Sequence, residues 1–325
     1  MRNVYQNMYD FALEFTDNDR DDAIVYRNKR ISFTDFAKEV DKCAGRFAAM
    51  GIVKGDCIAI CLPNIPQAEI AFYACAKMGA IASMVHPKTS PVEFARQVEL
   101  TKPKLALLNE INYFVFKPML KGVKIVFCSL ITGKGFIGLK KPVAYAANKS
   151  DGNEPAIYMH SGGTTGAPKT AILSSRCMNA LIDNLLLSMN YPFTKNDTML
   201  AALPIFHGFG LAVGIHLALC SKMASALVPI FRPKKVVEFI KNQHINVLSL
   251  IPRMLQKILD EPTFNGEVVK QLKYIYVGGD NLSENLRLKF NEKLKKEGST
   301  CVIQQGYGLT EMGSVCVLNY DLIKP

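Results

Sequence analysis

The stretch AIYMHSGGTTGAPKT, residues 156–170, joins a short apolar run to the densest group of small residues in the chain. The apolar run predicts a buried strand, and the loop after it holds three glycines, three threonines and one lysine. Glycine backbone can turn its N–H groups toward an anion because no Cβ interferes. Lys169 adds a mobile positive charge that suits phosphate. The stretch therefore predicts a phosphate-binding loop, with an ordinary surface turn as the alternative.

The loop differs from a Walker A loop, in which glycine stands directly before the lysine. Here Pro168 stands before Lys169. Proline fixes φ and removes a backbone donor, so the standard P-loop is excluded. A kinase or a P-loop ATPase is accordingly disfavoured, although phosphate binding by related physics is not.

Short apolar runs alternate with helical patterns along the chain. Strands are expected at residues 57–62, 81–85, 104–108, 124–127, 156–159, 199–203, 246–251, 273–277 and 301–304. Helices are expected near 64–79, 234–243, 252–260 and 283–297, and from the capping boxes that begin at Ser32 and Ser90. A repeated order of strand and then helix predicts an α/β fold with a largely parallel sheet.

Four glycine-bearing loops each follow an expected strand. They cover residues 160–170, 204–210, 278–283 and 305–311. In open α/β sheets, ligands bind outside the carboxyl ends of the strands, and all four loops leave that edge. Glycine after a strand usually marks only a turn, but the four loops together predict one shared site.

The size and charge of the chain limit its class. A length of 325 residues exceeds what one core usually fills, so two lobes are expected. The net charge of +11 suits an acidic partner such as a phosphorylated small molecule. The basic residues are scattered and form no recognisable nucleic-acid module, so we expect no nucleic-acid partner. The nine cysteines include no C-x-x-C pair, which favours a reducing, cytoplasmic location.

Residues 198–221 contain no aspartate, glutamate, lysine or arginine and are long enough to span a membrane. Pro204, Gly208 and Gly210 interrupt this run. We therefore expect a buried strand at 199–203, a loop, and a buried helix at 211–220, rather than a transmembrane segment. The first residues lack the long apolar core of a signal peptide.

The loop at 160–170 resembles the phosphate-loop signature of the adenylate-forming superfamily, which includes acyl-CoA synthetases, adenylation domains of peptide synthetases, and luciferases. The match runs through Lys169 and departs at Thr170, where the signature usually has glycine. The resemblance implies that the phosphates of ATP contact Ser161, Gly162, Gly163, Thr164, Thr165, Gly166 and Lys169.

The stretch QGYGLTE, residues 305–311, resembles the second core motif of the same superfamily. The resemblance implies that Tyr307 stacks on adenine, that Thr310 contacts phosphate, and that Glu311 holds Mg²⁺. Gly306 and Gly308 would then lie beside the nucleotide. A carboxylate oxygen is the hard ligand that Mg²⁺ prefers. We therefore expect Thr310 and Glu311 to act in catalysis together with the lysine of the phosphate loop.

Two further loops resemble parts of the adenine and acyl pocket in the superfamily. VGGDNLS, residues 277–283, implies close approach at Gly278 and Gly279 and a contact from Asp280 to the adenine amino group. An ordinary strand-to-helix turn explains Asp280 equally well. PIFHGFG, residues 204–210, implies that His207 gates the acyl site and takes part in catalysis on the substrate side.

The resemblance spans about residues 20–318 and implies two packed lobes of mainly parallel sheet flanked by helices. We expect lobe one at about 50–195 and lobe two at about 1–49 plus 196–320. In the superfamily, an aspartate for ribose, a hinge and a small C-terminal domain with a catalytic lysine follow the position of Glu311. None of them occurs within the 325 residues, so we expect a truncated large domain with little or no activity.

The implied activity has two steps. A carboxylic acid attacks ATP to give an acyl-adenylate and pyrophosphate, and CoA then forms a thioester. The implied cofactors are ATP, Mg²⁺ and CoA. Small and apolar residues in the glycine loops and near 251–255 predict an aliphatic or aromatic acid, with fatty acid metabolism as one setting. Two alternatives remain open: a non-catalytic nucleotide- or acyl-binding module, and an adenylation domain that serves a carrier protein.

Overall fold

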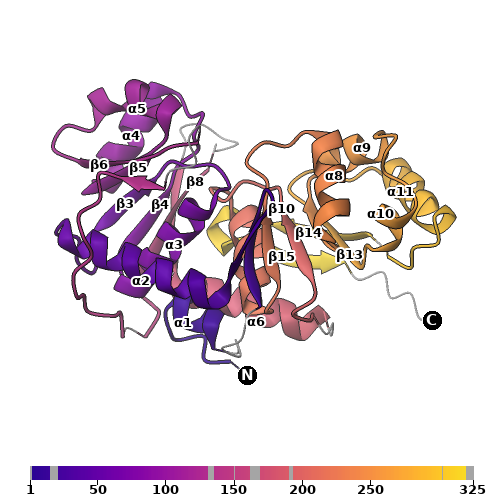
Figure 1. Ribbon diagram of the computed structural model, residues 1–325, viewed down its shortest axis with the longest axis horizontal. Helices are drawn as coiled ribbons and strands as arrows, with labels where there is room; N and C mark the ends of the chain where they lie inside the picture. Colours follow the sequence, from indigo (N-terminus) through magenta and orange to yellow (C-terminus); the bar gives the residue numbers. More distant parts are fainter. Residues whose placement is uncertain are drawn as a thin grey trace.

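The computed structural model describes residues 2–14, 21–130, 135–149, 151–161, 169–189, 193–301 and 303–319. Within these residues the strands form two sheets, one of seven strands and one of eight, with helices packed on both faces of each (Figure 1). The predicted α/β fold with mainly parallel sheets is confirmed.

The first sheet has the strand order β7-β6-β5-β3-β4-β8-β9. Its inner strands are parallel: β3 (Cys57–Ile60), β4 (Ile81–Met84), β5 (Leu105–Leu108), β6 (Lys124–Cys128) and β8 (Pro155–Ser161). The edge strands are antiparallel: β7 (Phe136–Ile137) and β9 (Lys169–Ser174). One face carries α2 (Phe33–Ala49) and α3 (Pro66–Met78), and the other carries α4 (Pro91–Thr101), α5 (Glu110–Phe116) and the short η1 (Lys117–Met119).

The second sheet has the strand order β15-β14-β13-β12-β10-β11-β1-β2. Its parallel strands are β1 (Asp22–Tyr26), β10 (Thr198–Ala201), β11 (Ala224–Leu227), β12 (Val247–Leu250), β13 (Tyr274–Val277) and β14 (Ile303–Gly308). The antiparallel edges are β2 (Lys29–Ser32) and β15 (Val315–Asn319). One face carries α8 (Pro233–Gln243), α9 (Pro252–Leu259), α10 (Glu267–Lys270) and α11 (Glu284–Lys296); the other carries α6 (Ser175–Met189), η2 (Gly210–Leu217) and α7 (Ala218–Cys220).

The local signals for helix starts work as the sequence predicts. The Ser32 hydroxyl accepts from the Asp35 N–H at 3.1 Å and so caps α2. The Ser90 hydroxyl accepts from the Glu93 N–H at 3.2 Å and caps α4. Each bond satisfies one of the free N–H groups in the first turn, which fixes where the helix begins.

One hydrophobic core reaches from the first sheet into the second. A buried asparagine in the loop after β3 adds polar contacts across this junction. Asn64 donates to the carbonyls of Ala201 at 2.8 Å and Leu203 at 2.7 Å, and it accepts from the Ile205 N–H at 2.8 Å. These three hydrogen bonds fix the segment after β10 against the first sheet.

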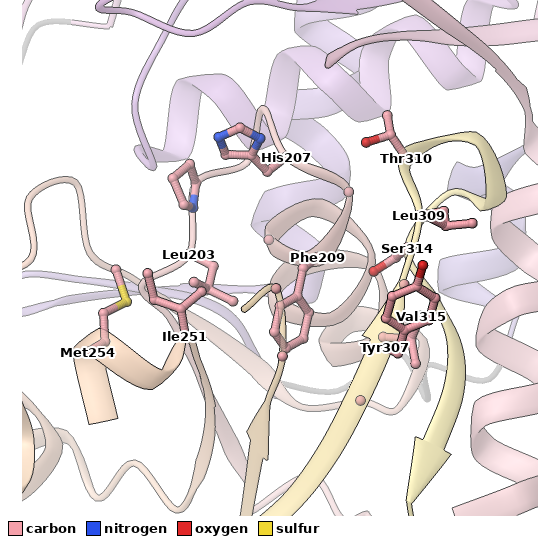
Figure 2. Close-up of a pocket in the computed structure, with 17 residues that line it drawn as sticks. Leu203, His207, Phe209, Ile251, Met254, Tyr307, Leu309, Thr310, Ser314 and Val315 are labelled. Carbon is pink, nitrogen blue, oxygen red and sulfur yellow. The ribbon is translucent and has the colours of Figure 1, made fainter. Parts of the chain in front are cut away.

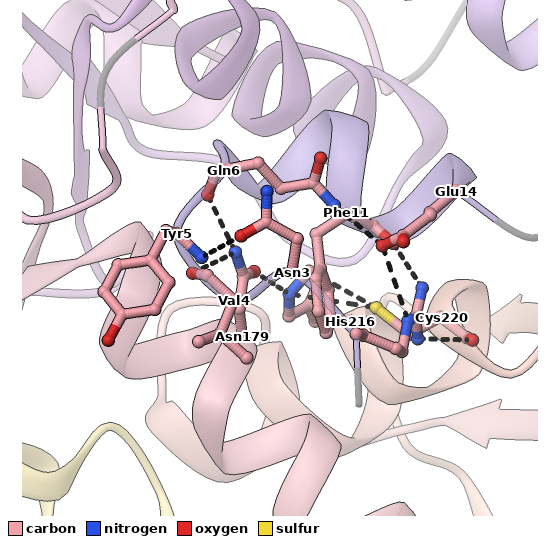
Figure 3. Close-up of polar contacts among 10 residues, drawn as sticks. Asn3, Val4, Tyr5, Gln6, Phe11, Glu14, Asn179, His216 and Cys220 are labelled. Atoms are coloured by element: carbon pink, nitrogen blue, oxygen red, sulfur yellow. Dashed lines mark hydrogen bonds and ion pairs between the residues drawn. The ribbon is translucent and has the colours of Figure 1, made fainter.

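The N-terminal segment, which includes α1 (Met8–Leu13), packs against α6, η2 and α7 (Figure 3). Asn179 on α6 donates to the carbonyls of Val4 at 3.2 Å and Gln6 at 2.8 Å, and its side-chain oxygen lies 3.1 Å from His216 Nε2. His216 Nδ1 lies 2.9 Å from the Tyr73 hydroxyl on α3. Burial lowers the pKa of His216 to about 3, so the ring is neutral. This buried network joins the first residues to both sheets.

The remaining differences from expectation concern element ends and strands that the sequence does not predict. The helix expected at 211–220 begins instead with wide π-helical turns over Gly210–Leu217, and only its last residues form α7. The strand expected at 301–304 extends to Gly308, so Tyr307 lies on a strand rather than in a loop. No strand is expected at the positions of β1, β2, β7, β9, β11 or β15, and of these β1 and β11 lie inside the second sheet. In the described ranges, no helix has the length and hydropathy that a membrane span needs.

Candidate functional site

A cavity of about 440 Å³ lies at the carboxyl ends of β10, β12, β13 and β14 (Figure 2). Leu203, Ile251 and Met254 form one side. Tyr307 and Val315 form the other, and the ring of the labelled Phe209 lies between the two sides. The further labelled lining residues are His207, Leu309, Thr310 and Ser314. Three of the four predicted glycine loops therefore meet at this one cavity.

Glycines allow these loops to touch one another. A Cβ on Gly278 would lie 2.8 Å from the Gly306 carbonyl oxygen and 3.3 Å from the ring of Phe209. A Cβ on Gly208 would lie 2.4 Å from the Gly313 carbonyl oxygen. The contacts of 2.8 Å and 2.4 Å are shorter than those that real Cβ atoms make, so a side chain at Gly278 or Gly208 would force these loops apart.

The stretch at 305–311 presents its side chains from a strand and a short helix. Tyr307 is 60% exposed on β14, and its ring lines the cavity. Thr310 and Glu311 lie on the one-turn η3 (Thr310–Met312), which packs against β8 and β9. The end of the second sheet thus meets the hairpin of the first sheet, where the phosphate loop is expected.

The hairpin β8–β9 carries both ends of the stretch at 161–169. Ser161 and Lys169 face each other in the strand register, and Lys169 is exposed. The predicted ligands Gly162, Gly163, Thr164, Thr165 and Gly166 lie outside the described residues. The described ends of the loop are therefore brought next to η3, which carries Thr310 and Glu311.

Glu311 does not line the main cavity. It borders a neighbouring cleft of about 550 Å³ between α6 and β15. Its carboxylate is exposed, and in the part of the chain that the structure describes no lysine, arginine or histidine forms an ion pair with it. A free carboxylate is available to a hard cation.

His207 lies at the rim of the cavity, across from Thr310 (Figure 2). Its ring centre is 5.0 Å from that of Phe206 and 6.2 Å from that of His86. The ring is open to the cavity on one side, but protein on the other sides desolvates it. This desolvation, with the nearby His86, lowers the pKa of His207, so the neutral imidazole dominates at pH 7.

Two features of the site differ from the sequence expectation or extend it. Asp280 is exposed, is not among the residues that line the cavity, and accepts from the Asn281 N–H at 2.7 Å. His86, beside His207, and Phe209 are site residues that the sequence analysis does not single out. The only sequence signal for His86 is its place just after an expected strand.

The fold and these glycine loops define the large domain of an adenylate-forming enzyme. The family model described as AMP-binding enzyme matches residues 14–325, so the chain belongs to that family. Among curated relatives, 4-coumarate–CoA ligase 5 of Oryza sativa subsp. japonica is 24% identical over 325 residues, covering 95% of this chain and 58% of that protein. The probable CoA ligase CCL5 of Humulus lupulus is 27% identical over 299 residues, covering 87% and 53%.

Among solved structures, ATP-bound MatB from Rhodopseudomonas palustris has the same fold. It superposes with a TM-score of 0.86 at 21% sequence identity, and the match covers 98% of this chain and 62% of that one. The family expected from the two sequence motifs is confirmed. The chain spans little more than half the length of the curated relatives it matches.

Proposed function

We propose that this chain forms the nucleotide- and acid-binding part of an acyl-CoA ligase. In the reaction, ATP activates a carboxylic acid as an acyl-adenylate, and CoA then receives the acyl group as a thioester. The observation that carries this proposal is the contact between η3 and the β8–β9 hairpin beside the cavity. It brings Thr310 and Glu311 to the strand ends that bear Ser161 and Lys169.

The cavity suits a planar base. Tyr307 offers an exposed aromatic face, and the lining also includes the backbone of Gly278 and Gly279. Gly306 and Gly308 add backbone beside the tyrosine. In our proposal adenine stacks on the Tyr307 ring, and the triphosphate extends past Thr310 toward the hairpin. Stacking on aromatic side chains is a common means of holding a base.

Glu311 and Lys169 supply the charges that a triphosphate needs. The Glu311 carboxylate is a free hard ligand of the kind that fits Mg²⁺. When bound, Mg²⁺ would neutralise phosphate charge and orient the leaving pyrophosphate. The exposed Lys169 would bind phosphate oxygens from the hairpin side.

The first step needs no protein nucleophile. A substrate carboxylate oxygen attacks the α-phosphorus of ATP in line, and the bond from that phosphorus to pyrophosphate breaks. Catalysis then consists of positioning and charge neutralisation. The neutral His207 at the rim can donate one N–H to the carboxylate without forming an ion pair that would hold it back. In the second step the CoA thiolate attacks the acyl carbon, and AMP leaves.

The cavity favours an apolar acid. None of its lining residues, all within the described ranges, is an aspartate, glutamate, lysine or arginine. Leu203, Phe209, Ile251, Met254 and Val315 supply the apolar surface. A second charge on the substrate would lie unpaired against this surface, which is unfavourable. We therefore propose a monocarboxylic acid with an aromatic or aliphatic tail. Aromatic acids come first, because a named relative is a 4-coumarate–CoA ligase.

Pyrophosphate exchange tests the proposal. The protein is incubated with ATP, Mg²⁺, labelled pyrophosphate and a panel of aromatic and aliphatic acids, and label appearing in ATP is measured. Binding of a non-hydrolysable acyl-sulfamoyl adenosine is measured in parallel by calorimetry. We expect tight binding of the analogue that matches one class of acid, and weak exchange that depends on the same class. If neither exchange nor analogue binding occurs with any acid, the proposed function is wrong.

Matched variants test the assigned residues. Lys169→Ala and Glu311→Gln are each expected to slow exchange by about 10²–10³-fold, because each removes charge stabilisation from the transition state. Lys234→Ala removes an exposed lysine of α8 far from the cavity and serves as the control. Unchanged exchange in both site variants would contradict the roles of Lys169 and Glu311 while leaving the reaction class intact.

A further inference from the structure

Three polar side chains on the neighbouring strands β4, β8 and β9 contact one another near the end of the β8–β9 hairpin. They are Ser83, His160 and Thr170. His160 faces Thr170 in the strand register, and His160 Nδ1 lies 2.9 Å from the Thr170 hydroxyl. His160 Nε2 lies 3.0 Å from the hydroxyl of Ser83 on β4. Ser83 is fully buried, so this chain of contacts begins in the interior of the first sheet and ends one residue from Lys169.

The histidine in this chain is neutral. Burial lowers the pKa of His160 to about 4, while Glu93 on α4 opposes the shift and Arg96 on α4 adds to it. A neutral imidazole has one donating and one accepting nitrogen. A hydroxyl can both donate and accept, so Ser83 and Thr170 complement either tautomer. Both ring nitrogens are therefore paired, and the ring is held between two strands.

Thr170 stands where the phosphate-loop signature usually has glycine. We propose that Thr170 and His160 form a positioning pair, which rests on the proposed function: together they hold β9 in register up to Lys169 and so aim that lysine at the triphosphate. Glycine at this position would offer no side chain to the histidine and would leave the strand end freer. Threonine favours an extended backbone and bonds to His160, which is itself fixed by the buried Ser83.

The Thr170–His160 pair should affect binding of the β- and γ-phosphates, because it acts through Lys169. Lys169 follows the hairpin register, and its side chain lies on the opposite face of β9 from Thr170. Losing the Thr170 hydroxyl would free the strand end and leave one imidazole nitrogen without its partner. The lysine would then have to be ordered when ATP binds. A ligand without the β- and γ-phosphates does not need this lysine, so AMP affinity should not change.

The test compares ATP with AMP. Thr170→Val keeps the size and branching of threonine but removes the hydroxyl. We expect its Kd for ATP to rise about tenfold, its Kd for AMP to stay within about twofold, and its folded fraction by circular dichroism to match the wild type. Thr170→Ser is expected to recover most of the ATP affinity. Ile172→Val, on the same face of β9 and 63% exposed at the wild-type residue, is the control and should change neither affinity.

A second variant keeps the test decisive if Thr170→Val fails to fold. Ser83→Ala leaves the Thr170 contact but frees the other imidazole nitrogen, so it should weaken ATP binding in the same direction by a smaller factor. Wild-type ATP affinity in both variants, or equal losses for ATP and AMP, would overturn the positioning role. Selective loss of ATP affinity, with neither acid-dependent exchange nor acyl-sulfamoyl adenosine binding in the wild type, would support the pair and reject the ligase proposal. A wild type that binds no ATP would overturn both.

Discussion

The backbone of β14 leaves no room for a side chain at Gly308, where it faces its hairpin partner β15. A Cβ there would lie 2.2 Å from the carbonyl oxygen of Ser314, whereas at Gly306 the nearest atoms are side-chain carbons at 3.5 Å. We expect Gly308→Ala to lower the free energy of unfolding by about 1–3 kcal/mol, because the two strands must move apart. Gly306→Ala, two residues away on the same strand, should change it by less than about 1 kcal/mol. Urea unfolding of both variants checks this, and equal losses would contradict it.

Glu69 on α3 is fully buried, and its carboxyl group should make the stability of the protein depend on pH. Both oxygens of Glu69 lie near the Ser225 hydroxyl, the closer one at 2.9 Å. Burial raises the pKa of Glu69 from 4.5 to about 8, although the Ser225 hydrogen bond opposes the shift. Between these two pH values the unfolded chain releases the proton while the folded protein keeps it. Stability therefore falls as pH rises through this window.

We expect Glu69→Gln to remove this dependence. The amide still accepts from Ser225 but carries no ionisable proton. At pH 7 the variant should be more stable than the wild type by about 3 kcal/mol, and at pH 4 the two should be nearly equal. Urea unfolding at several pH values between 4 and 8 measures the difference. A constant difference across this range would show that the Glu69 carboxyl does not titrate as expected.

At the scale of elements, the amino ends of β10, β12 and β13 are joined by one buried carboxylate. Asp197, before β10, accepts from Asn246 at 2.7 Å, from the Thr194 N–H at 2.8 Å, and from Lys273. Burial alone would raise its pKa, but hydrogen bonds from Lys273, Thr194 and Asn246 outweigh burial and lower it. The stability this group contributes is therefore present above pH 3.8 and is lost as the pH falls below that value.

Removing this carboxylate should loosen the three strands together. We expect Asp197→Ala to lower the free energy of unfolding by about 3–5 kcal/mol at pH 7, because Lys273 and Asn246 lose a buried partner. Asp260→Ala, an exposed aspartate whose side chain accepts only from Gln256 among the described side chains, is the control and should change little. Hydrogen exchange should show the loss of protection in β10, β12 and β13. Loss confined to β10 would contradict the joint role.

Apolar runs predict most of the inner strands because those strands are buried on both faces, but the inner strands β1 and β11 are not predicted. β3, β5, β10 and β12 are buried at every position, so four consecutive apolar or small residues suffice to find them. The edge strand β2 has two exposed residues and two half-buried ones and no apolar run, whereas β15 is mostly exposed although four of its five residues are apolar. Each pairs antiparallel with the strand directly before it in the chain, β2 with β1 and β15 with β14, and burial patterns do not reveal such a pairing.

The candidate site also has features that the sequence predicts and features that it does not. The glycine loops and the order of the two motifs predict that residues of 204–210, 278–283 and 305–311 meet, and residues from all three loops line the cavity. Side-chain partners from distant strands are not predictable from spacing. His86 beside His207 and Ser83 beside His160 are examples, because both pairs depend on which strands lie next to each other. Likewise, only the pairing of β8 with β9 shows that His160 lies opposite Thr170.

At the scale of the whole molecule, Asn64 joins the first sheet to the segment that borders the cavity. We expect Asn64→Ala to destabilise the protein by about 2–4 kcal/mol and to weaken ATP binding, because Leu203 and Pro204, which line the cavity, lose their attachment. Asn112→Ala removes a similarly buried asparagine that donates to the Cys61 carbonyl within the first sheet. It should cost comparable stability without changing ATP affinity. Equal effects of both variants on ATP binding would contradict the role of Asn64.

The place of β1 affects how the chain can fold while it is being synthesised. β1 pairs with β11, so that Ile24 lies opposite Ser225, and Asn179 on α6 holds the segment before α1. At roughly 5–20 residues per second, the ribosome needs roughly 10–40 s to add the residues between these two strands. During this interval β1 can pair with β2, but its other edge has no partner strand, and the first sheet can form before β11 is added. The residues of β1 are thus made long before β11 completes their surroundings, so a chaperone that binds short apolar segments would find them partly exposed on the nascent chain.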